Sequence, residues 1–379
     1  MKAGPEERPR RRVYLRTFGC RANQYDTEAV RAMIESAGGE IVATPDAADA
    51  AVFNSCAVTA AAEADLRQSV RRAARRRPTL QTVVMGCAAA RDDGTIAALP
   101  TVDRVVGGAD LVAVAAALGL RAPARPPNVQ TGTRALLRIQ DGCDEHCTFC
   151  ATTLARGAAR SRAMDALVDE ASHLAERHPE IVLTGIHIGH YGVDTDESLS
   201  GLAERLIRDV PMVRFRLSSL EATEVDDRLS ELFSEATRLA PHLHAPLQSG
   251  SDTVLKRMGR HWYTAQTYAR SLERLVARGT PFGLGADVIA GFPGETDEDH
   301  RRTLALVDDL PFTYLHVFPY SVRPGTPAER LGSHLPSEII DRRARELRAV
   351  GERRAIGPHH ARGVRRSACR AESMRPRRP

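Results

Sequence analysis

The chain has little lysine, few aromatic residues and no long apolar run. Its 379 residues include only two lysines, Lys2 and Lys256, so nearly all of the positive charge is arginine. Aromatic residues make up 4% of the chain, which argues against a base-stacking surface spread over the whole protein. No apolar stretch is long enough to cross a membrane, and residues 1–12 are polar, without the apolar core of a secretory signal. We therefore expect a cytoplasmic protein with no membrane partner, and a net charge of +5 that permits an RNA partner.

Six of the seven cysteines form two groups of three. They are Cys143, Cys147 and Cys150 in one short run, and Cys20, Cys56 and Cys87 far apart in the sequence. Disulfides are rare in the reducing compartment expected here. A four-iron cluster normally takes one thiolate per iron, so a site with three cysteines leaves one iron open to an exchangeable ligand. Both groups therefore predict an iron–sulfur site at which chemistry can occur.

Two simpler interpretations compete with this prediction. In the compact run, His146 and the three thiolates would make the usual four ligands of a zinc ion. The spacing Cys-x3-Cys-x2-Cys, with Phe149 beside the last cysteine, is however a poor match to zinc ribbons. The scattered cysteines could each be an ordinary buried thiol, because free cysteine is among the most buried residue types.

The first third of the chain predicts a parallel α/β sheet. Strands are expected at 13–18, 50–54 and 82–85, with an amphipathic helix at 26–37 and an arginine-rich helix at 60–77. Alternating strands and helices imply right-handed crossovers. Each scattered cysteine follows one of these strands, at the edge where open α/β sheets bind ligands. Their convergence on one edge favours a shared site over three unrelated thiols.

A second α/β unit follows a proline-rich segment. Residues 120–132 contain Pro123, Pro126 and Pro127 and are expected to be a linker. Six strand candidates then occur at 135–139, 181–184, 213–218, 242–245, 282–289 and 314–319. They predict a partial (βα)6 TIM-type barrel whose chemistry lies at the carboxyl ends of its strands. The expected domains are thus a Rossmann- or flavodoxin-like sheet at 13–119 and a barrel at 133–354, with disordered basic ends at 1–12 and 355–379.

The motifs of this chain resemble those of the radical S-adenosylmethionine (SAM) methylthiotransferases. The matching segments are residues 18–28, 54–59, 86–87, 140–150, 156–157, 160–162, 183–185, 217–221, 247–251, 287–295 and 318–321. The resemblance extends from about residue 13 to residue 348. Within the family, the sequence Asn23-Gln24-Tyr25 favours the subgroup that acts on threonylcarbamoyladenosine in tRNA.

This resemblance implies two [4Fe-4S] clusters and two SAM molecules. The cluster of Cys143, Cys147 and Cys150 would generate the radical that removes a hydrogen from carbon 2 of the modified adenosine beside the anticodon. The cluster of the scattered cysteines would present the methylthio group, so both sites must face one pocket. The implied partners are the anticodon stem-loop of tRNA and a flavodoxin- or ferredoxin-like electron donor.

The resemblance also implies residues that contact SAM. They are Phe149, Arg160, Thr184, Gly185, Ser218, Glu221, Gln248 and Asp287. Several of these lie in glycine-rich loops, where simple turn chemistry is the alternative. Arg156, Arg160 and Arg162 are expected to reach either the SAM carboxylate or tRNA phosphates. The arginines of helix 60–77 are a second candidate phosphate surface, or else only a solvated face.

One part of the chain departs from the family pattern. Relatives that modify tRNA end in a small β-barrel RNA-binding module, the TRAM module, whereas residues 355–379 are rich in proline and arginine and lack alternating apolar positions. We therefore expect no such module here, and Cys369 in this segment to be uninvolved. The departure keeps methylthiolation of a peptide or protein side chain open as an alternative. A third hypothesis, of a different class, is a non-catalytic iron–sulfur or zinc protein that binds RNA.

Overall fold

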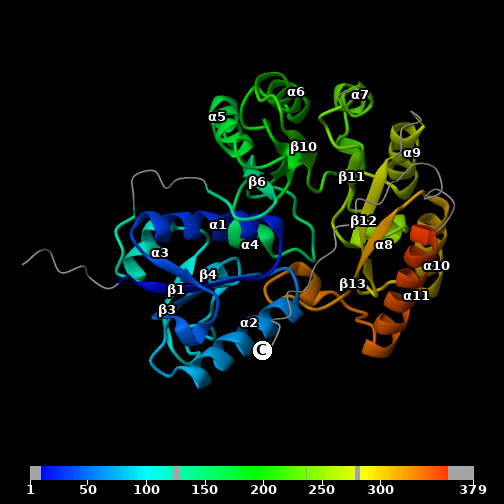
Figure 1. The fold of residues 1–379 in the computed structure, drawn as a ribbon. Coiled ribbons are helices and arrows are strands. Elements are labelled where there is room, and N and C mark those ends of the chain that lie inside the picture. The colour runs from blue at the N-terminus through cyan, green and yellow to red at the C-terminus, as the bar shows by residue number, and fades with distance from the viewer. Residues whose placement is uncertain (1–9, 123–128, 236, 278–281, 357–379) are drawn as a thin grey trace, which may run out of the picture.

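The computed structural model describes residues 10–122, 129–235, 237–277 and 282–356. Its first unit is a parallel sheet of five strands in the order β2-β1-β3-β4-β5 (Figure 1). The strands are β1 (Arg12–Thr17), β2 (Glu40–Val42), β3 (Ala50–Ser55), β4 (Gln81–Gly86) and β5 (Val102–Gly107). This is the flavodoxin-like order, which reverses direction between β1 and β3 and so opens a crevice beyond their carboxyl ends.

Three helices cover the two faces of this sheet. Helices α1 (Arg21–Ser36) and α3 (Leu111–Ala117) pack on one face, and α2 (Ala60–Arg76) packs on the other. Val30, Met33 and Ile34 of α1 are fully buried against the first face, and Leu66 and Val70 of α2 are buried against the second. The sheet is thus a rigid layer from which the loops after β1, β3 and β4 project.

The second unit is a partial barrel of six parallel strands in two three-stranded sheets. The strands are β6 (Arg134–Arg138), β9 (Glu180–Thr184), β10 (Arg214–Leu217), β11 (His242–His244), β12 (Gly283–Ala290) and β13 (Tyr314–Pro319). A bridge between Ser219 and His244 joins the two sheets beyond β10. The surrounding helices are α5 (Met164–Ala175), α6 (Leu199–Asp209), α7 (Asp227–Glu235), α8 (Asp252–Arg257), α9 (Ala265–Val276), α10 (Asp297–Asp309) and α11 (Ser337–Ile356).

The two faces of the barrel strands carry different side chains. Leu137, Leu183 and Phe215 are fully buried in the core under the outer helices. The alternate positions face the inside of the barrel, as expected for a period of two. Many of these inner side chains are polar, among them Arg216 and His244. The interior is therefore a polar lumen rather than a closed apolar core.

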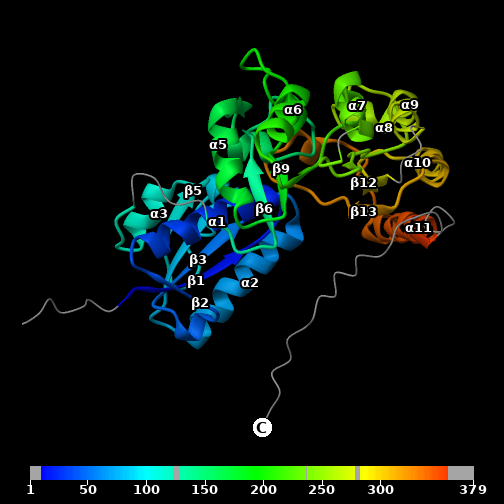
Figure 2. The ribbon, with the colours of Figure 1, turned by 45° about the horizontal axis from the view of Figure 1, so that its top comes forward.

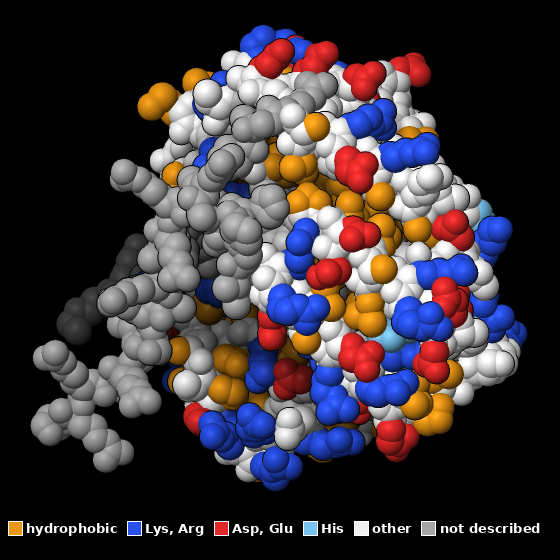
Figure 3. All heavy atoms as spheres, turned by 90° about the vertical axis from the view of Figure 1, so that its right-hand side faces the viewer, with side chains coloured by type: hydrophobic (Ala, Val, Ile, Leu, Met, Phe, Trp, Pro, Cys, Tyr) orange, Lys and Arg blue, Asp and Glu red, His pale blue; other side chains and the backbone are white. Residues whose placement is uncertain are grey.

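The first unit lies against the open side of the barrel. Helix α1 contacts β6, and both views show α1 lying beside that strand (Figures 1 and 2). On the opposite side of the molecule, acidic and basic side chains are interspersed over the described part of the face shown in Figure 3. None of the described helices is both long and apolar enough to span a bilayer.

The expected fold class is confirmed, with local differences. Strands β2 and β5 were not predicted, because neither contains a continuous apolar run long enough to indicate a strand. Helix α1 begins at Arg21, five residues before the start predicted at 26. The reason is that Arg21, Asn23 and Gln24 are polar, so the residues before 26 do not continue the apolar period of the helix. The ends at 1–9 and 357–379, with Cys369, and the middle of the expected linker lie outside the described residues.

Candidate functional site

Three cysteines lie at the carboxyl edge of the first sheet. Cys20 follows β1, Cys56 follows β3 and Cys87 follows β4. Cys20 is exposed, and the other two are buried. Because β1 and β3 flank the point where the strand order reverses, their loops face one crevice. Residues separated by more than thirty positions are brought together there. We call these cysteines the sheet trio.

The loops of the sheet trio are tied together by one buried amide. The side-chain nitrogen of Asn23 donates to the carbonyl oxygens of Phe18 (2.9 Å) and Ser55 (2.8 Å). Gly19 adopts φ +93°, and a Cβ at this position would overlap the sulfur of Cys56. A side chain larger than hydrogen is therefore excluded where the first two cysteines approach each other.

Burial controls the acidity of the two buried cysteines of the sheet trio, Cys56 and Cys87. Burial, together with the nearby Cys20 and Cys87 sulfurs, raises the pKa of Cys56 to about 11 against the effect of a hydrogen bond from Val58 N. It also raises the pKa of Cys87, against the opposing effect of the Arg156 guanidinium, whose Nε lies 3.2 Å from the Cys87 sulfur. These thiols are poor acids on their own, so the thiolate forms need a cationic partner, as a metal cluster would supply.

The other three cysteines share one loop at the mouth of the barrel. Cys143, Cys147 and Cys150 follow β6 and the short strand β7 (Gln140–Asp141) and are half-buried. The loop turns at Gly142, which has φ +76° and whose Cβ would overlap the carbonyl oxygen of Ala158. It is anchored by Cys143 N, which donates to Gly157 O (3.0 Å). We call these cysteines the loop trio.

Two charged side chains contact sulfurs of the loop trio. Burial raises the pKa of Cys147 to about 12, against the effect of Arg260, whose Nη1 lies 3.4 Å from its sulfur. His187 Nδ1 lies 3.7 Å from the Cys143 sulfur, and its Nε2 lies 2.7 Å from Glu224. Burial alone would lower the pKa of His187, but its contacts with Cys143 and Glu224 outweigh burial and raise it to about 10. A protonated His187 can thus donate to the sulfur.

Neither trio is shaped as a site for a single ion. Among the described residues, two groups of three side chains bring their ligand atoms within 4.8 Å of one another, and neither contains a cysteine. A zinc ion needs its thiolates closer than this, since each Zn–S bond is about 2.3 Å. His146, the fourth ligand of the zinc alternative, is exposed. More widely spaced thiolates fit a cubane, in which each binds a different iron.

A cavity of about 570 Å³ lies between the two units. Its sheet-side wall includes Cys20 and Cys56, and its barrel-side wall includes Thr184, Gly185 and Ser218. Thr152 also lines it, and the hydroxyl of Thr152 lies 3.1 Å from the sulfur of Cys150. The cavity therefore reaches the sheet trio directly and comes within one side chain of the loop trio.

A smaller cavity of about 160 Å³ adjoins the first one. Phe149 and Gln248 line it, and Asp287 and Phe318 line both cavities. Gln248 has φ +63°, a strained conformation for a residue with a side chain. Six of the eight residues expected to contact SAM thus line these two adjoining spaces.

The structure places the other two expected SAM residues differently. Glu221 is buried and accepts hydrogen bonds from Arg260 and from the Trp262 indole. Arg160 is exposed, and its guanidinium donates to the carbonyl oxygens of Ala158 and Arg156 at 3.4 Å. Neither residue lines the two cavities.

The sequence predicts that Arg156 reaches either the SAM carboxylate or tRNA phosphates, but the structure buries its side chain among protein partners instead. It is buried and donates to Asp26 (2.8 Å) and Asn23 (2.8 Å) of the first unit and to Asp141 (3.1 Å) of the barrel. These partners raise its pKa, although burial alone would lower it. Arg156 is therefore a clamp between the units that also touches Cys87.

A second buried arginine, in the segment after the last barrel strand, also joins the two units. Arg323, after β13, donates to the carbonyl oxygen of Ala57 (3.2 Å) and pairs with Glu63 of α2 (3.5 Å). Ala57 directly follows Cys56. Both buried arginines of the interface thus act on residues at or beside the sheet trio.

Sequence reasoning missed a group of aromatic and imidazole side chains in the lumen. His244, Tyr314 and His316 line the larger cavity. Asp287 accepts from His244 (2.9 Å) and His316 (3.2 Å), and these bonds outweigh burial and lower the pKa of Asp287 to about 2. The sequence did contain a signal for this group. His242 and His244 are two residues apart on one predicted strand, and Tyr314 and His316 are two residues apart on another, so each pair lies on one face of its strand.

Comparison with known proteins places both units in recognised families. Residues 12–107 match the uncharacterized protein family UPF0004, and residues 137–307 match the radical SAM superfamily. The threonylcarbamoyladenosine tRNA methylthiotransferase MtaB of Bacillus subtilis is 37% identical over 90% of this chain and 81% of its own. A tRNA-2-methylthio-N(6)-dimethylallyladenosine synthase of Erythrobacter litoralis is 34% identical over 89% of this chain and 81% of its own.

A solved structure shares the fold. It is the radical SAM methyltransferase TsrM of Kitasatospora setae, which superposes with a TM-score of 0.63 over 84% of this chain and 75% of that protein. The two sequences are 16% identical, so the likeness concerns the arrangement of elements alone.

Proposed function

The chain belongs to the radical SAM methylthiotransferase family, and on that premise we propose that it places a methylthio group on carbon 2 of threonylcarbamoyladenosine beside the anticodon of tRNA. As a radical SAM enzyme it uses SAM and an iron–sulfur cluster. The choice of nucleoside is supported by relatives in several organisms that are 34–37% identical over about 90% of the chain and carry the threonylcarbamoyladenosine name.

The observation that carries this proposal is the cavity between the units. A methylthiotransferase must bring a sulfur donor and a radical source to one substrate atom. Cys20 and Cys56 line the cavity from one side, and Thr152, in contact with Cys150, lines it from the other. An enzyme with only one reactive centre would have no need for two open cysteine trios on one space.

We assign one [4Fe-4S] cluster to each trio. The sheet trio would hold the auxiliary cluster in a domain of residues 13–119, and the loop trio would hold the SAM-binding cluster in a domain of residues 133–354. When bound, SAM and the clusters supply the one-electron chemistry that activates an aromatic C–H bond and delivers the methylthio group.

The protein's own side chains hold and shield these groups. Arg156 and Arg260 each donate to one cysteine sulfur, which stabilises thiolate charge in a buried setting. We assign Phe149, Gln248 and Asp287 to one end of a SAM site, because all three line the smaller cavity. The proposed setting is the cytoplasm, with the anticodon stem-loop as substrate and a flavodoxin- or ferredoxin-like electron donor.

The test is a reaction with reconstituted protein. Anaerobically reconstituted enzyme, SAM, a sulfide source and a reductant are incubated with tRNA that contains threonylcarbamoyladenosine, and nucleosides are analysed by mass spectrometry. We expect the 2-methylthio derivative, and none from the Cys143→Ala or Cys56→Ala variant. Methylthiolation of peptides but never of tRNA, or SAM cleavage that never yields a methylthio product, would overturn the proposal.

A further inference from the structure

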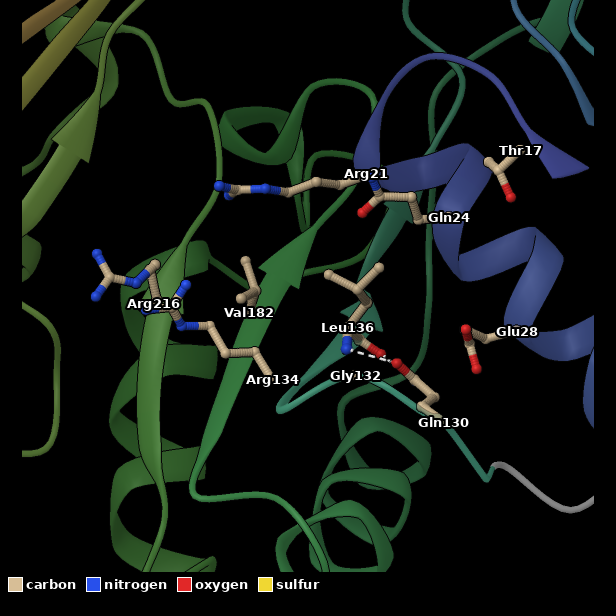
Figure 4. A pocket seen from close by; sticks show the side chains of 10 residues that line it. All are labelled: Thr17, Arg21, Gln24, Glu28, Gln130, Gly132, Arg134, Leu136, Val182 and Arg216. Atoms are coloured by element: carbon tan, nitrogen blue, oxygen red, sulfur yellow. Dashed lines mark hydrogen bonds between the residues drawn. The ribbon is translucent and has the colours of Figure 1, made fainter. Parts of the chain in front are cut away.

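A second, arginine-rich pocket of about 320 Å³ lies beside the cavity between the trios. It is bounded by α1 on one side and by the inner faces of β6, β9 and β10 on the other. Figure 4 shows the side chain of Arg21 reaching from the start of α1 across the pocket toward the barrel strands, where Arg134 and Arg216 lie. Three guanidiniums thus line one small space.

The fixed charges of this pocket are unbalanced. Arg134 (2.8 Å), Arg214 (2.8 Å) and Arg216 (2.6 Å) all pair with the same carboxylate, that of Glu180. Glu28, the acid in the pocket lining, accepts hydrogen bonds from the backbone N and hydroxyl of Thr131 (3.0 Å each) and pairs with Arg31 (3.8 Å) rather than with a pocket arginine. The single carboxylate of Glu180 cannot neutralise the three arginines that pair with it, so positive charge remains beside the pocket.

Arg21 adds to this surplus. Within the described part of the chain, no carboxylate lies within ion-pair distance of its guanidinium. Its guanidinium lines the same pocket as those of Arg134 and Arg216, so the three positive charges repel one another. Guanidiniums that are held close together in this way are stabilised by a bound anion.

The position of Arg21 connects this pocket to the proposed reaction site. Arg21 directly follows Cys20 and lines both the arginine-rich pocket and the larger cavity. An anionic group held by Arg21 would therefore belong to a molecule whose remainder lies in the cavity between the trios. Gln24, one turn further along α1, offers an amide to the same pocket.

We propose that this pocket binds the carboxylate of the threonylcarbamoyl group, with Arg21 as its main contact, so that it selects the acidic modified adenosine. This inference rests on the proposed function. The threonyl part of that group carries a carboxylate and a hydroxyl, whereas a dimethylallyl group is an uncharged hydrocarbon. A planar guanidinium binds a carboxylate through two parallel hydrogen bonds and offers nothing comparable to a hydrocarbon.

A tRNA phosphate has similar chemistry, so the experiment separates the two sources. Three anticodon stem-loops are synthesised with threonylcarbamoyladenosine, its uncharged threoninamide analogue, or plain adenosine, and their binding is measured by fluorescence anisotropy. We expect the wild-type protein to bind the carboxylate form about tenfold or more tightly than the amide form. Arg21→Met should remove that preference and leave binding of the amide form unchanged, and Arg21→Lys should keep part of it.

Controls keep the outcome interpretable. Arg177→Met, at an exposed site after α5, removes one positive charge away from the pocket and should preserve the preference. Arg216→Met, on the opposite wall, should reduce the preference even if the iron content shows that the Arg21 variants assemble poorly. Equal weakening of all three stem-loops by Arg21→Met would indicate a phosphate contact, and unchanged binding would indicate no contact; either result overturns the inference. A wild-type protein that leaves threonylcarbamoyladenosine unmodified in the reaction above would instead defeat the proposed function.

Discussion

The sheet trio and the loop trio are held in different ways. The sheet trio depends on three loops of a rigid five-stranded sheet, and two of its cysteines are buried. The loop trio lies within eight residues of one loop, and all three of its cysteines are half-buried. The first arrangement needs the whole sheet to be folded before its ligands meet. The second needs only that one loop be kept in shape by the barrel around it.

One buried arginine accompanies each trio, but the two arginines have different partners. Arg156 contacts Cys87 and bonds to acids of both units, so it couples the sheet trio to the docking of the units. Arg260 contacts Cys147 and bonds to Glu221 and Tyr263, all within the barrel. The comparison shows that the loop trio is internal to the barrel, whereas the sheet trio belongs partly to the interface.

The strongest test of this comparison is removal of either trio. If the sites are independent, replacing all three cysteines of one trio with alanine halves the iron of the reconstituted protein, from about eight to about four atoms per chain. Iron and sulfide analysis after anaerobic reconstitution measures this. Loss of all iron from one triple variant, or zinc in place of iron, would show that the sites are not two separate clusters.

The next largest effect is expected from the interface arginine. Arg156→Met leaves the buried Asp26 with Arg138 as its remaining partner, and breaking a buried ion pair typically costs about 3 kcal/mol. Hydrogen exchange should therefore accelerate both in α1 and in the loop that follows β7. Arg260→Met is the matched variant, and its acceleration should be confined to the barrel. If hydrogen exchange in α1 accelerated equally in both variants, the distinction between the two arginines would be wrong.

The sequence was sufficient to predict the parts of the site that lie directly after strands. The cysteine positions and the strands β1, β3 and β4 could be predicted, because apolar runs followed by Gly-Cys or Ser-Cys are local signals. The partners of Arg156 could not, since Asp26 lies 130 residues away and the contact exists only after the units dock. A buried arginine and an arginine that reaches phosphate look alike in sequence.

The lumen chemistry was hidden for a related reason. His244 and His316 occupy alternate positions of strands that were predicted, but which face points inward depends on the closure of the barrel. Arg21 lies before residue 26, where the helix was predicted to start, so its reach across the pocket depended on a helix start that apolar periodicity does not mark. Contacts between residues of two different units can be identified only from the tertiary structure.

A smaller effect should come from the glycines that shape the loops. Gly86 has φ +97° and precedes Cys87, and Gly142 has φ +76° and precedes Cys143. At both positions an added Cβ would overlap backbone or side-chain oxygens, so alanine should cost about 2 kcal/mol and reduce iron at the adjacent trio only. Gly94→Ala is the control, because it has φ +99° with nothing within 4 Å of the added Cβ. Equal iron loss in all three variants would assign the effect to strain alone.

The smallest predicted effect is a loss of stability in mild acid that arises in the barrel and not in the first unit. All 13 histidines lie at residue 146 or beyond, so mild acid titrates imidazoles only in the barrel and its flanking segments. Burial, together with Arg216, His244 and Arg21, lowers the pKa of His242 to about 4, and nearby Glu180 opposes this only in part. A folded-state pKa below the unfolded value of about 6.5 means that the unfolded form binds the proton more readily. Stability from a neutral His242 is therefore lost as the pH falls from about 6.5 toward 4.

The sole tryptophan, Trp262, lies in the barrel and reports its unfolding by fluorescence. Between pH 6.5 and 5 we expect His242 to account for a loss of about 1 kcal/mol, once partial solvent screening of a half-buried group is allowed for. The concentration of guanidinium chloride at the midpoint of unfolding should therefore fall less over this pH range for His242→Gln than for the wild type. Arg177→Met should follow the wild type, since Arg177 is exposed and away from the lumen. Parallel slopes for His242→Gln and the wild type would show that burial and the lumen arginines together do not depress the pKa of this imidazole.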